Sequence, residues 1–415
     1  MPASTMQPNL LNISPEGAVR QQALVNWQAT GWPGPRVESW RFTKLDNVTS
    51  KDLTAVSSAT NGDATPLAID AAWPADAVIL QFVNGVLDAN CLAGLPSNVS
   101  AGDLGIDETA MRTLMDLAPA NHPVSSLSMA VMSSGLLLDI DGVVDAPIVL
   151  QFTGDNVALS AHPVILIRLA AGATAVIAEW HASKTGLSAP LIGIDLGDGA
   201  KLDMAKIQAD DAGTAHIAAT GARIGEGASF AGFTLSTGAQ LARLETHVKM
   251  NGEGGDCQLS AIYLGRGDQH HDVTTYMDHA IGHCTSNQII RGVLDDRARG
   301  VYQGKVHVAK DAQKTDGQQM SRALLLSRKA EADAKPELEI YADDVICAHG
   351  ATVGELDENQ LFYLTSRGIP RNIARAMLIE AFLLDAIDTV ENNVLQNLLR
   401  PAAEAWMAAN GKEGV

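Results

Sequence analysis

The stretch that decides the fold is GATAVIAEWHASKTGLSAPLIGIDLGDGAKLDMAKIQ, residues 172–208. It contains two copies of one unit, at 172–181 and 199–208, in which Gly and a small residue precede a run of alternating residues. A tight turn followed by an alternation of period two is typical of a strand that buries one of its faces. The stretch therefore predicts repeated turn-and-strand units.

The unit recurs at a nearly constant spacing along the chain. Gly142-Val143, Gly172-Ala173, Gly199-Ala200, Gly227-Ala228 and Gly254-Gly255 follow one another at 30, 27, 28 and 27 residues. A strand repeat of this period indicates a β-solenoid, in which each coil buries its apolar face only by stacking on the next. The alternatives are chance recurrence among 37 glycines, and a leucine-rich repeat, which the absence of an LxxLxL unit excludes.

Helical patterns flank the repeats. On the N-terminal side, residues 78–88 predict a hairpin that turns at Asn84-Gly85, and 107–117 predict a short helix. Apolar residues at helical spacing predict four further helices, one before Gly31 and three after Asp357: Val19, Ala23, Leu24 and Trp27; Leu361, Phe362 and Leu364; Ile373, Met377, Leu378, Ala381 and Phe382; Val390, Val394, Leu395 and Leu398. Trp27, Trp32 and Trp40 predict a hydrophobic clasp. We expect a mainly β fold: a mainly helical region over 1–120, a parallel β-helix over 121–350 and a helical domain over 351–415.

The composition limits the classes of function. A formal net charge of −19 disfavours binding to nucleic acid or to an anionic membrane, because both surfaces would repel the chain. The N-terminal sequence MPASTMQPNLLNISPEG lacks an apolar signal region, and no run reaches the roughly 18 to 20 apolar residues of a membrane span. The four cysteines are scattered, so we interpret them as thiols. We therefore expect a cytoplasmic protein.

The candidate site is the Cys347-Ala348-His349 step in ELEIYADDVICAHGATVG, residues 337–354. If Ile346 points into the solenoid, Cys347 and His349 point out together, separated by two strand rises of about 3.3 Å each. A thiolate and a neutral imidazole both suit iron. One of each is too few for a permanent cluster, so a partner would have to supply the rest. The alternative is a small buried Cys beside a hydrogen-bonded surface His.

A second group of metal-binding side chains lies in HHDVTTYMDHAIGHCTS, residues 270–286. His279 and His283 would share one face of a helix as in zinc sites, but in strands they lie about 13 Å apart. We interpret His270, His271, His279 and His283 as histidines of the solenoid surface, although a secondary site stays open. Cys257 and Cys284 are expected to be small buried residues. No GxxxxGK[ST], GxSxG or HExxH motif occurs.

Four segments of the chain resemble one known family. They are GWPGPRVESWRFTKL (31–45), HPVSSLSMAVMSSGLLLDIDGVVDAPIVL (122–150), VYQGKVHVAKDAQKTDGQQMSRALLLS (301–327) and ELEIYADDVICAHGATVGELDENQLFYLTSRGI (337–369). They are similar to the SufB/SufD family of iron–sulfur cluster assembly scaffolds. The Gly after Cys-Ala-His, where SufB members have Glu, is more similar to the SufD branch.

The resemblance implies a right-handed parallel β-helix between helical ends. It implies a non-catalytic scaffold in a complex with SufB and two copies of the SufC ATPase. A nascent, transient iron–sulfur cluster would form between SufB and this chain, with His349, and Cys347 beside it, as metal ligands. The helices after Asp357 would bind SufC. Reduced flavin is associated with such complexes, but no dinucleotide motif places it on this chain.

Two other functions remain open from the residues alone. A β-solenoid carbohydrate-active enzyme would use carboxylates in a cleft, and Asp210-Asp211 or Asp295-Asp296 could be offered for that purpose. Adjacent residues on a strand point to opposite faces, which argues against such pairs. A structural homodimer that pairs the edges of two β-helices is compatible with the scaffold function.

Overall fold

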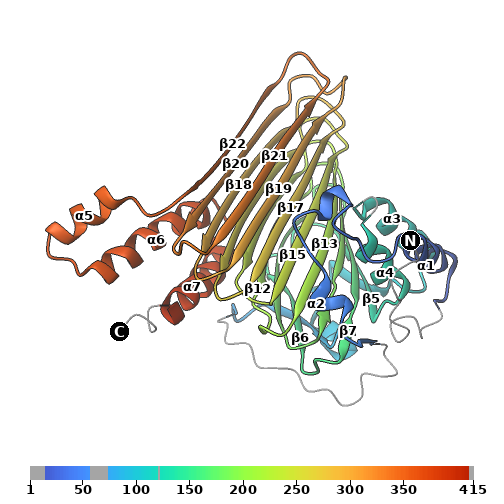
Figure 1. The fold of residues 1–415 in the computed structure, drawn as a ribbon. Coiled ribbons are helices and arrows are strands. Elements are labelled where there is room, and N and C mark those ends of the chain that lie inside the picture. Colours follow the sequence, from blue (N-terminus) through green and yellow to red (C-terminus); the bar gives the residue numbers. More distant parts are fainter. Residues whose placement is uncertain (1–14, 57–72, 120–121, 411–415) are drawn as a thin grey trace.

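A computed structural model describes residues 15–56, 73–119 and 122–410. Over these residues the protein is a parallel β-solenoid with helices on its N-terminal and C-terminal sides (Figure 1). The predicted fold class, mainly β with a β-helix between helical ends, is therefore confirmed.

The helices fall into two groups, one before the solenoid and one after it. The first group comprises α1 (Ala18–Thr30), α2 (Asp46–Thr49), α3 (Glu108–Leu117) and α4 (Pro123–Ala130), with short 3₁₀ turns η2 (Glu38–Trp40) and η3 (Ala89–Gly94). The second group comprises α5 (Glu358–Ser366), α6 (Arg371–Ile387) and α7 (Asn393–Asn410). The predicted hairpin is formed by β2 (Val78–Val83) and β3 (Val86–Leu87), and Asn84 and Gly85 both have positive φ at its turn.

The solenoid consists of two sheets to which the chain contributes strands in alternation. The first sheet contains β21 (Glu331–Ile340), β19 (Arg299–Val308), β17 (His270–His279), β15 (Leu241–Met250), β13 (Ala215–Ile224), β11 (Leu191–Leu196), β8 (Pro163–Leu169), β5 (Ser134–Ile140) and β4 (Val99–Asp103), with β1 (Thr54–Ala55), β7 (Leu159–Ala161) and β10 (Leu187–Ser188) beside this path. The second contains β22 (Ile346–Gly354), β20 (Asp316–Leu325), β18 (Thr285–Leu294), β16 (Asp256–Gly265), β14 (Ser229–Ser236), β12 (Lys201–Gln208), β9 (Thr174–Ser183), β6 (Ile148–Gly154), β2 and β3.

The repeated glycines make the turns that lead into the strands of the second sheet. Gly142, Gly172, Gly199, Gly227 and Gly254 have φ of 81°, 71°, 67°, 60° and 70°, in the left-handed region that glycine occupies without a steric cost. The amide groups of Gly172, Gly199 and Gly227 donate to carbonyl oxygens one coil further along, at 2.7 to 2.8 Å. Each turn is therefore bonded to the next, and the repeat predicted from the sequence is confirmed.

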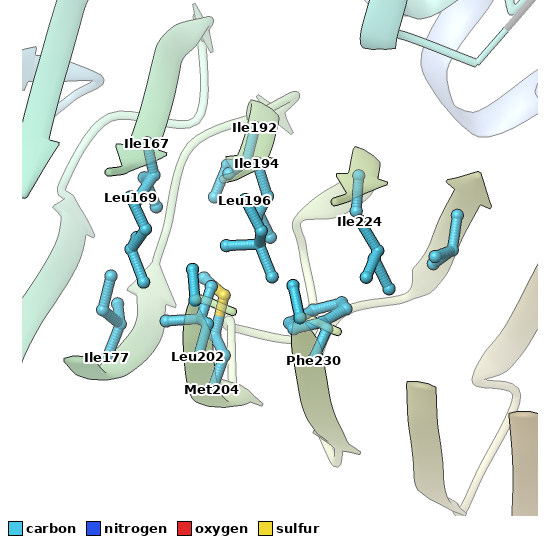
Figure 2. Close-up of a cluster of buried hydrophobic side chains, with 14 of the residues drawn as sticks. Ile167, Leu169, Ile177, Ile192, Ile194, Leu196, Leu202, Met204, Ile224 and Phe230 are labelled. Carbon is cyan, nitrogen blue, oxygen red and sulfur yellow. The ribbon is translucent and has the colours of Figure 1, made fainter. Parts of the chain in front are cut away.

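The inner faces of the two sheets enclose the apolar core. Figure 2 shows Ile167, Ile194 and Ile224 of the first sheet facing Ile177 and Leu202 of the second. Burial of such side chains stabilises a fold by about 1.5 to 3 kcal/mol each. Since every coil supplies both walls of this core, no coil buries its apolar residues alone.

Helices cover parts of the outer faces. Trp27 and Trp40 pack with Leu166 and Ile217 on the outside of the first sheet, and Trp32 contacts Trp27 edge to face at 4.9 Å. The hydrophobic clasp predicted for these tryptophans is confirmed. On the second sheet, residues of α6 and α7 pack against β12, β16 and neighbouring strands. Among the described residues, no helix combines the length and the apolar character needed to cross a membrane.

The helix predicted from Ile373 to Phe382 is present as α6, but the first part of its apolar stripe faces solvent. Ile373 and Met377 are exposed, whereas Leu383 and Ile387 are buried against the second sheet. The reason is that only the C-terminal half of α6 meets the solenoid. Figure 1 shows α5 and the start of α6 projecting away from it.

We expect Gly227→Ala to lower the free energy of unfolding by about 1 to 2 kcal/mol, because an L-residue in the left-handed region places its Cβ too close to the backbone. Apart from its own residue and its two chain neighbours, a Cβ at Gly227 meets no atom within 4 Å, so the effect isolates the local backbone conformation. Gly34→Ala is the control, since Gly34 has open space around it and no positive φ. Equal urea midpoints for the two variants would contradict this account.

Candidate functional site

The candidate ligands lie in the terminal coil, which consists of β21 and β22. Among the described strands, each of the two is the last of its sheet and pairs on one side only, β21 with β19 and β22 with β20. Their free edges carry unpaired backbone groups, which form a template for pairing with another chain. The predicted candidate residues thus stand at the open end of the solenoid.

Cys347 and His349 lie on one face of β22, but that face is the inner one. Cys347 pairs with Gly317 of β20, and His349 pairs with Gln319, whose side chain is buried. Ile346, predicted to point inward, is 68% exposed. The prediction that the two ligands share a face is confirmed, and the prediction that they point outward is wrong.

The error comes from the turn that separates the two strands. The outward orientation follows only if the alternation of β21 continues across residues 341–345 into β22, as in a single strand. In the structure the chain leaves the first sheet at Ile340 and enters the second at Ile346. A turn between sheets resets which residues face inward, so the phase of one strand carries no information about the next.

The Cys347 thiol is half-buried at the rim of the apolar core. It packs against the inner cluster together with Leu338 and Val345. Its sulfur lies over Gly317, where an added Cβ would approach to 3.3 Å. Burial raises the pKa of the Cys347 thiol, and the nearby Asp316 carboxylate raises it further. A metal that binds this sulfur must therefore displace a firmly held proton.

His349 is exposed, and buried amides lie in register beneath it. Gln288, Gln319 and His349 occupy successive strands of the second sheet at one inner position. Nε2 of Gln288 has no hydrogen-bond partner among the described residues, while the Tyr302 hydroxyl donates to Oε1 of Gln288 at 3.5 Å. This row of polar residues has no signal in the sequence, because the register between coils depends on turn lengths.

Cys347 and His349 are the two candidate metal ligands that the described part of the chain places in the terminal coil. No group of three or more His, Cys, Asp or Glu that could hold a metal ion occurs in residues 15–56, 73–119 and 122–410. An iron–sulfur cluster takes four ligands in most proteins. The terminal coil could therefore contribute to a cluster but not hold one by itself.

The histidines of residues 270–286 do not form a surface group. His271 and His279 are fully buried inside β17, and the surface interpretation is wrong for them. Nδ1 of His271 bonds the Ser236 hydroxyl and Nε2 of His279 bonds the Ser286 hydroxyl, both at 2.8 Å. His283 is exposed in a turn with φ of 57°. Whether each histidine is buried or exposed depends on how the coils stack, and the sequence does not show that register.

The surroundings of Cys257 and Cys284 indicate a structural role for both thiols. All four cysteines are free, as predicted, and Cys257 and Cys284 are fully buried, also as predicted. Burial raises the pKa of the Cys257 thiol well above its ordinary value. These two thiols are therefore poor ligands compared with the half-buried Cys347.

The aspartates offered for an enzyme have structural partners. Asp210 is buried and accepts hydrogen bonds from the Ser183 amide and the Gln208 side chain at 2.7 and 2.9 Å. Asp211 accepts from the Gly213 amide at 3.0 Å in an exposed turn. The Asp295 carboxylate accepts from the Asp296 amide at 2.8 Å. These carboxylates stabilise turns and buried polar groups.

Comparison with known families assigns the chain. The family described as "SUF system FeS cluster assembly, SufBD core domain" matches residues 152–382, more than half of the 415 residues. The chain belongs to the SufBD family. The SufBD match runs from β6 into α6 and therefore includes the terminal coil with Cys347 and His349.

Two SufBD proteins are similar to the chain along most of its length, and a third is similar over a shorter part. The iron–sulfur cluster assembly protein SufD of Escherichia coli (strain K12) is 29% identical over 389 residues, which cover 91% of this chain and 89% of that protein. A SufBD family protein of Mycobacterium leprae is 30% identical, with 86% of each chain covered. SufD of Bacillus subtilis is 36% identical over 155 residues, 37% of this chain and 35% of that one. The chain is thus a SufD-like protein of iron–sulfur cluster assembly.

We expect the SufBD solenoid to lose stability as the pH falls from 6.5 toward 4. Burial lowers the pKa of His271 to about 3 and that of His279 to about 4. The folded protein keeps both rings neutral while the unfolded chain takes up protons near pH 6.5. Each such histidine therefore costs about 2 kcal/mol of stability at pH 5.

The measurement is the urea midpoint at pH 7.5, 6.5 and 5.5. Wild type should show a falling midpoint, and His271→Gln should show a shallower fall because it removes one of these protons. An equal slope in both proteins would mean that His271 does not contribute to the acid sensitivity.

Proposed function

We propose that this chain is the non-catalytic SufD subunit of a SufB–SufC–SufD complex that assembles iron–sulfur clusters. Family membership supports a role in iron–sulfur cluster assembly. The single observation that supports a contribution of ligands is the structure of the terminal coil. It presents a half-buried thiol and an exposed imidazole on one face, beside two unpaired strand edges. The nascent cluster is the cargo of the complex and not a resident cofactor of this chain.

In this proposal SufB docks on the terminal coil and completes the ligand set. His349 is accessible, whereas the Cys347 sulfur is held at the rim of the core. We therefore assign the imidazole as the main ligand and the thiol as a ligand that engages after losing its proton. The site is incomplete on this chain alone, because a cluster usually takes four protein ligands and the terminal coil offers two.

The C-terminal helical domain, residues 351–415, is the proposed binding site for the SufC ATPase. Its projecting hairpin exposes Phe362, Tyr363, Ile373 and Met377 to solvent. Exposed aromatic and apolar side chains that lie together mark interaction sites. ATP hydrolysis would belong to SufC, since the sequence carries no phosphate-binding loop.

The other partner assignments remain proposals of the same kind. The N-terminal region (1–120) and the β-helix (121–350) would present the terminal coil to SufB, in the cytoplasm and without nucleic acid or membrane. A homodimer through the same strand edges would compete with SufB. Reduced flavin, if it binds the complex, is not placed on this chain.

We expect His349→Ala to prevent cluster build-up in the co-purified complex while the fold stays intact. The side chain is exposed, so its removal leaves no cavity in the core. The measurement is iron and acid-labile sulfide per complex after anaerobic reconstitution, together with the urea midpoint.

Thr352→Ala is the matched control, since Thr352 lies on the outer face of the same strand. It should retain the wild-type iron content. A normal cluster spectrum in His349→Ala would remove His349 from the site, and Cys347→Ala in the same assay separates ligation by the thiol from its packing.

We expect Phe362→Ser to weaken binding of SufC by about tenfold or more, because a buried aromatic anchor contributes over 1.4 kcal/mol to a typical interface. The measurement is titration calorimetry with purified SufC. Ile106→Ser is the control, since Ile106 is equally apolar and exposed but lies before α3. Unchanged affinity in Phe362→Ser would place the SufC site elsewhere.

A further inference from the structure

A short segment of the N-terminal region crosses the outer face of the first sheet. This segment, Glu38–Thr43, begins with the 3₁₀ turn η2 and contacts β15, β17, β19 and β21, four neighbouring strands. Figure 1 shows the blue N-terminal chain beside the solenoid, near the strands labelled β13 and β15. We call residues 38–43 the strap. The strap joins the beginning of the chain to the terminal coil of the solenoid.

One end of the strap is firmly anchored. The Trp40 ring is 1% exposed and stacks on the guanidinium of Arg243, whose carbon lies 4.1 Å from the ring centroid. Arg243 is fully buried and pairs with Asp272 and with Glu245. The Thr43 hydroxyl also donates to Asp272. A buried charge network of this kind fixes the strap, because removing one partner would leave a buried charge unpaired.

The other end of the strap reaches the last two strands of the sheet. The Gln303 side-chain amide of β19 donates to the Ser39 carbonyl at 3.2 Å. The Lys335 ammonium of β21 bonds the Glu38 carboxylate at 2.8 Å. Lys335 also contacts Glu337 on its own strand at 3.2 Å. The Glu38–Lys335 pair therefore links the terminal coil to a part of the molecule outside the sheet.

The terminal coil is the part of the solenoid that most needs such a link. β21 pairs with β19 alone, and both sides of the strand remain partly exposed. Edge elements with few buried contacts open more readily than the core. Cross-strand pairs such as Arg299–Asp333 hold β21 to β19, but they open together with the edge. The strap is anchored to β15 and β17, so it does not open together with this edge.

We propose that the strap positions the terminal coil, with Glu38 and Lys335 as positioning residues for Cys347 and His349. The connection runs through the coil itself, since Leu338 of β21 and Cys347 of β22 pack against the same inner cluster. The ordering of β21 and β22 by the strap is independent of function. The benefit of this ordering for cluster assembly rests on the function proposed above.

The test is amide hydrogen exchange of the full chain without partners, followed by mass spectrometry. Glu38→Gln removes the charge that reaches Lys335, and Glu38 is exposed, so the variant should fold normally. Peptides from β21 and β22 should exchange about two- to fivefold faster, the range expected for loss of one exposed ion pair. Peptides from β9 to β14 should not change.

Glu337→Gln is the matched control, because it removes the other carboxylate that contacts Lys335 without cutting the strap. It should leave β21 and β22 at the wild-type rate. Unchanged exchange in Glu38→Gln, or equal acceleration in both variants, would overturn the proposal. A Glu38→Gln/Gln303→Ala variant removes both contacts beyond the anchor and should give the larger effect.

Cluster assembly provides a separate measurement. In the reconstituted complex, Glu38→Gln should lower the iron content part of the way toward that of His349→Ala. If His349→Ala retains its cluster, the proposed function fails while the exchange result still decides whether the strap orders the coil. If His349→Ala loses its cluster and Glu38→Gln does not, the positioning role is wrong.

Discussion

Each inner coil of this solenoid is stabilised by the two coils that cover it, whereas the terminal coil has one neighbour among the described strands. The inner cluster takes apolar residues from both sheets of successive coils, so burial is shared along the whole array. At β21 and β22 the array stops with backbone groups and inner side chains exposed. The same constraint that builds the fold thus leaves one incomplete surface, and the candidate ligands lie on it.

The chemistry of this surface follows from its position. Cys347 stands where the core meets solvent, so its thiol holds its proton more tightly than a free cysteine. His349, two residues further along the strand, has no coil above it and is exposed. The two candidate ligands therefore differ in access: the thiol lies at the rim of the core and the imidazole faces solvent.

Polar ladders on the outer face keep the coils in register up to this surface. Asp139, Arg168, Asp195 and Arg223 occupy paired positions on four adjacent strands, and their side chains form bidentate ion pairs. A slip of one residue would separate these charges and turn the inner residues outward. The strap also links neighbouring coils to one another, but it does so from outside the sheet.

The sequence alone determined the repeat, the helical ends and the shared face of Cys347 and His349, because glycine turns, strand alternation and helix periodicity are local properties. It could not determine that this face is the inner one, since a turn between two sheets resets the alternation. It also gave no sign that His271 and His279 are buried, that Gln319 lies beneath His349, or that Glu38 reaches Lys335. Gln319 and His349 are 30 positions apart and Glu38 and Lys335 are 297 apart, and only the stacking of the coils brings such residues together.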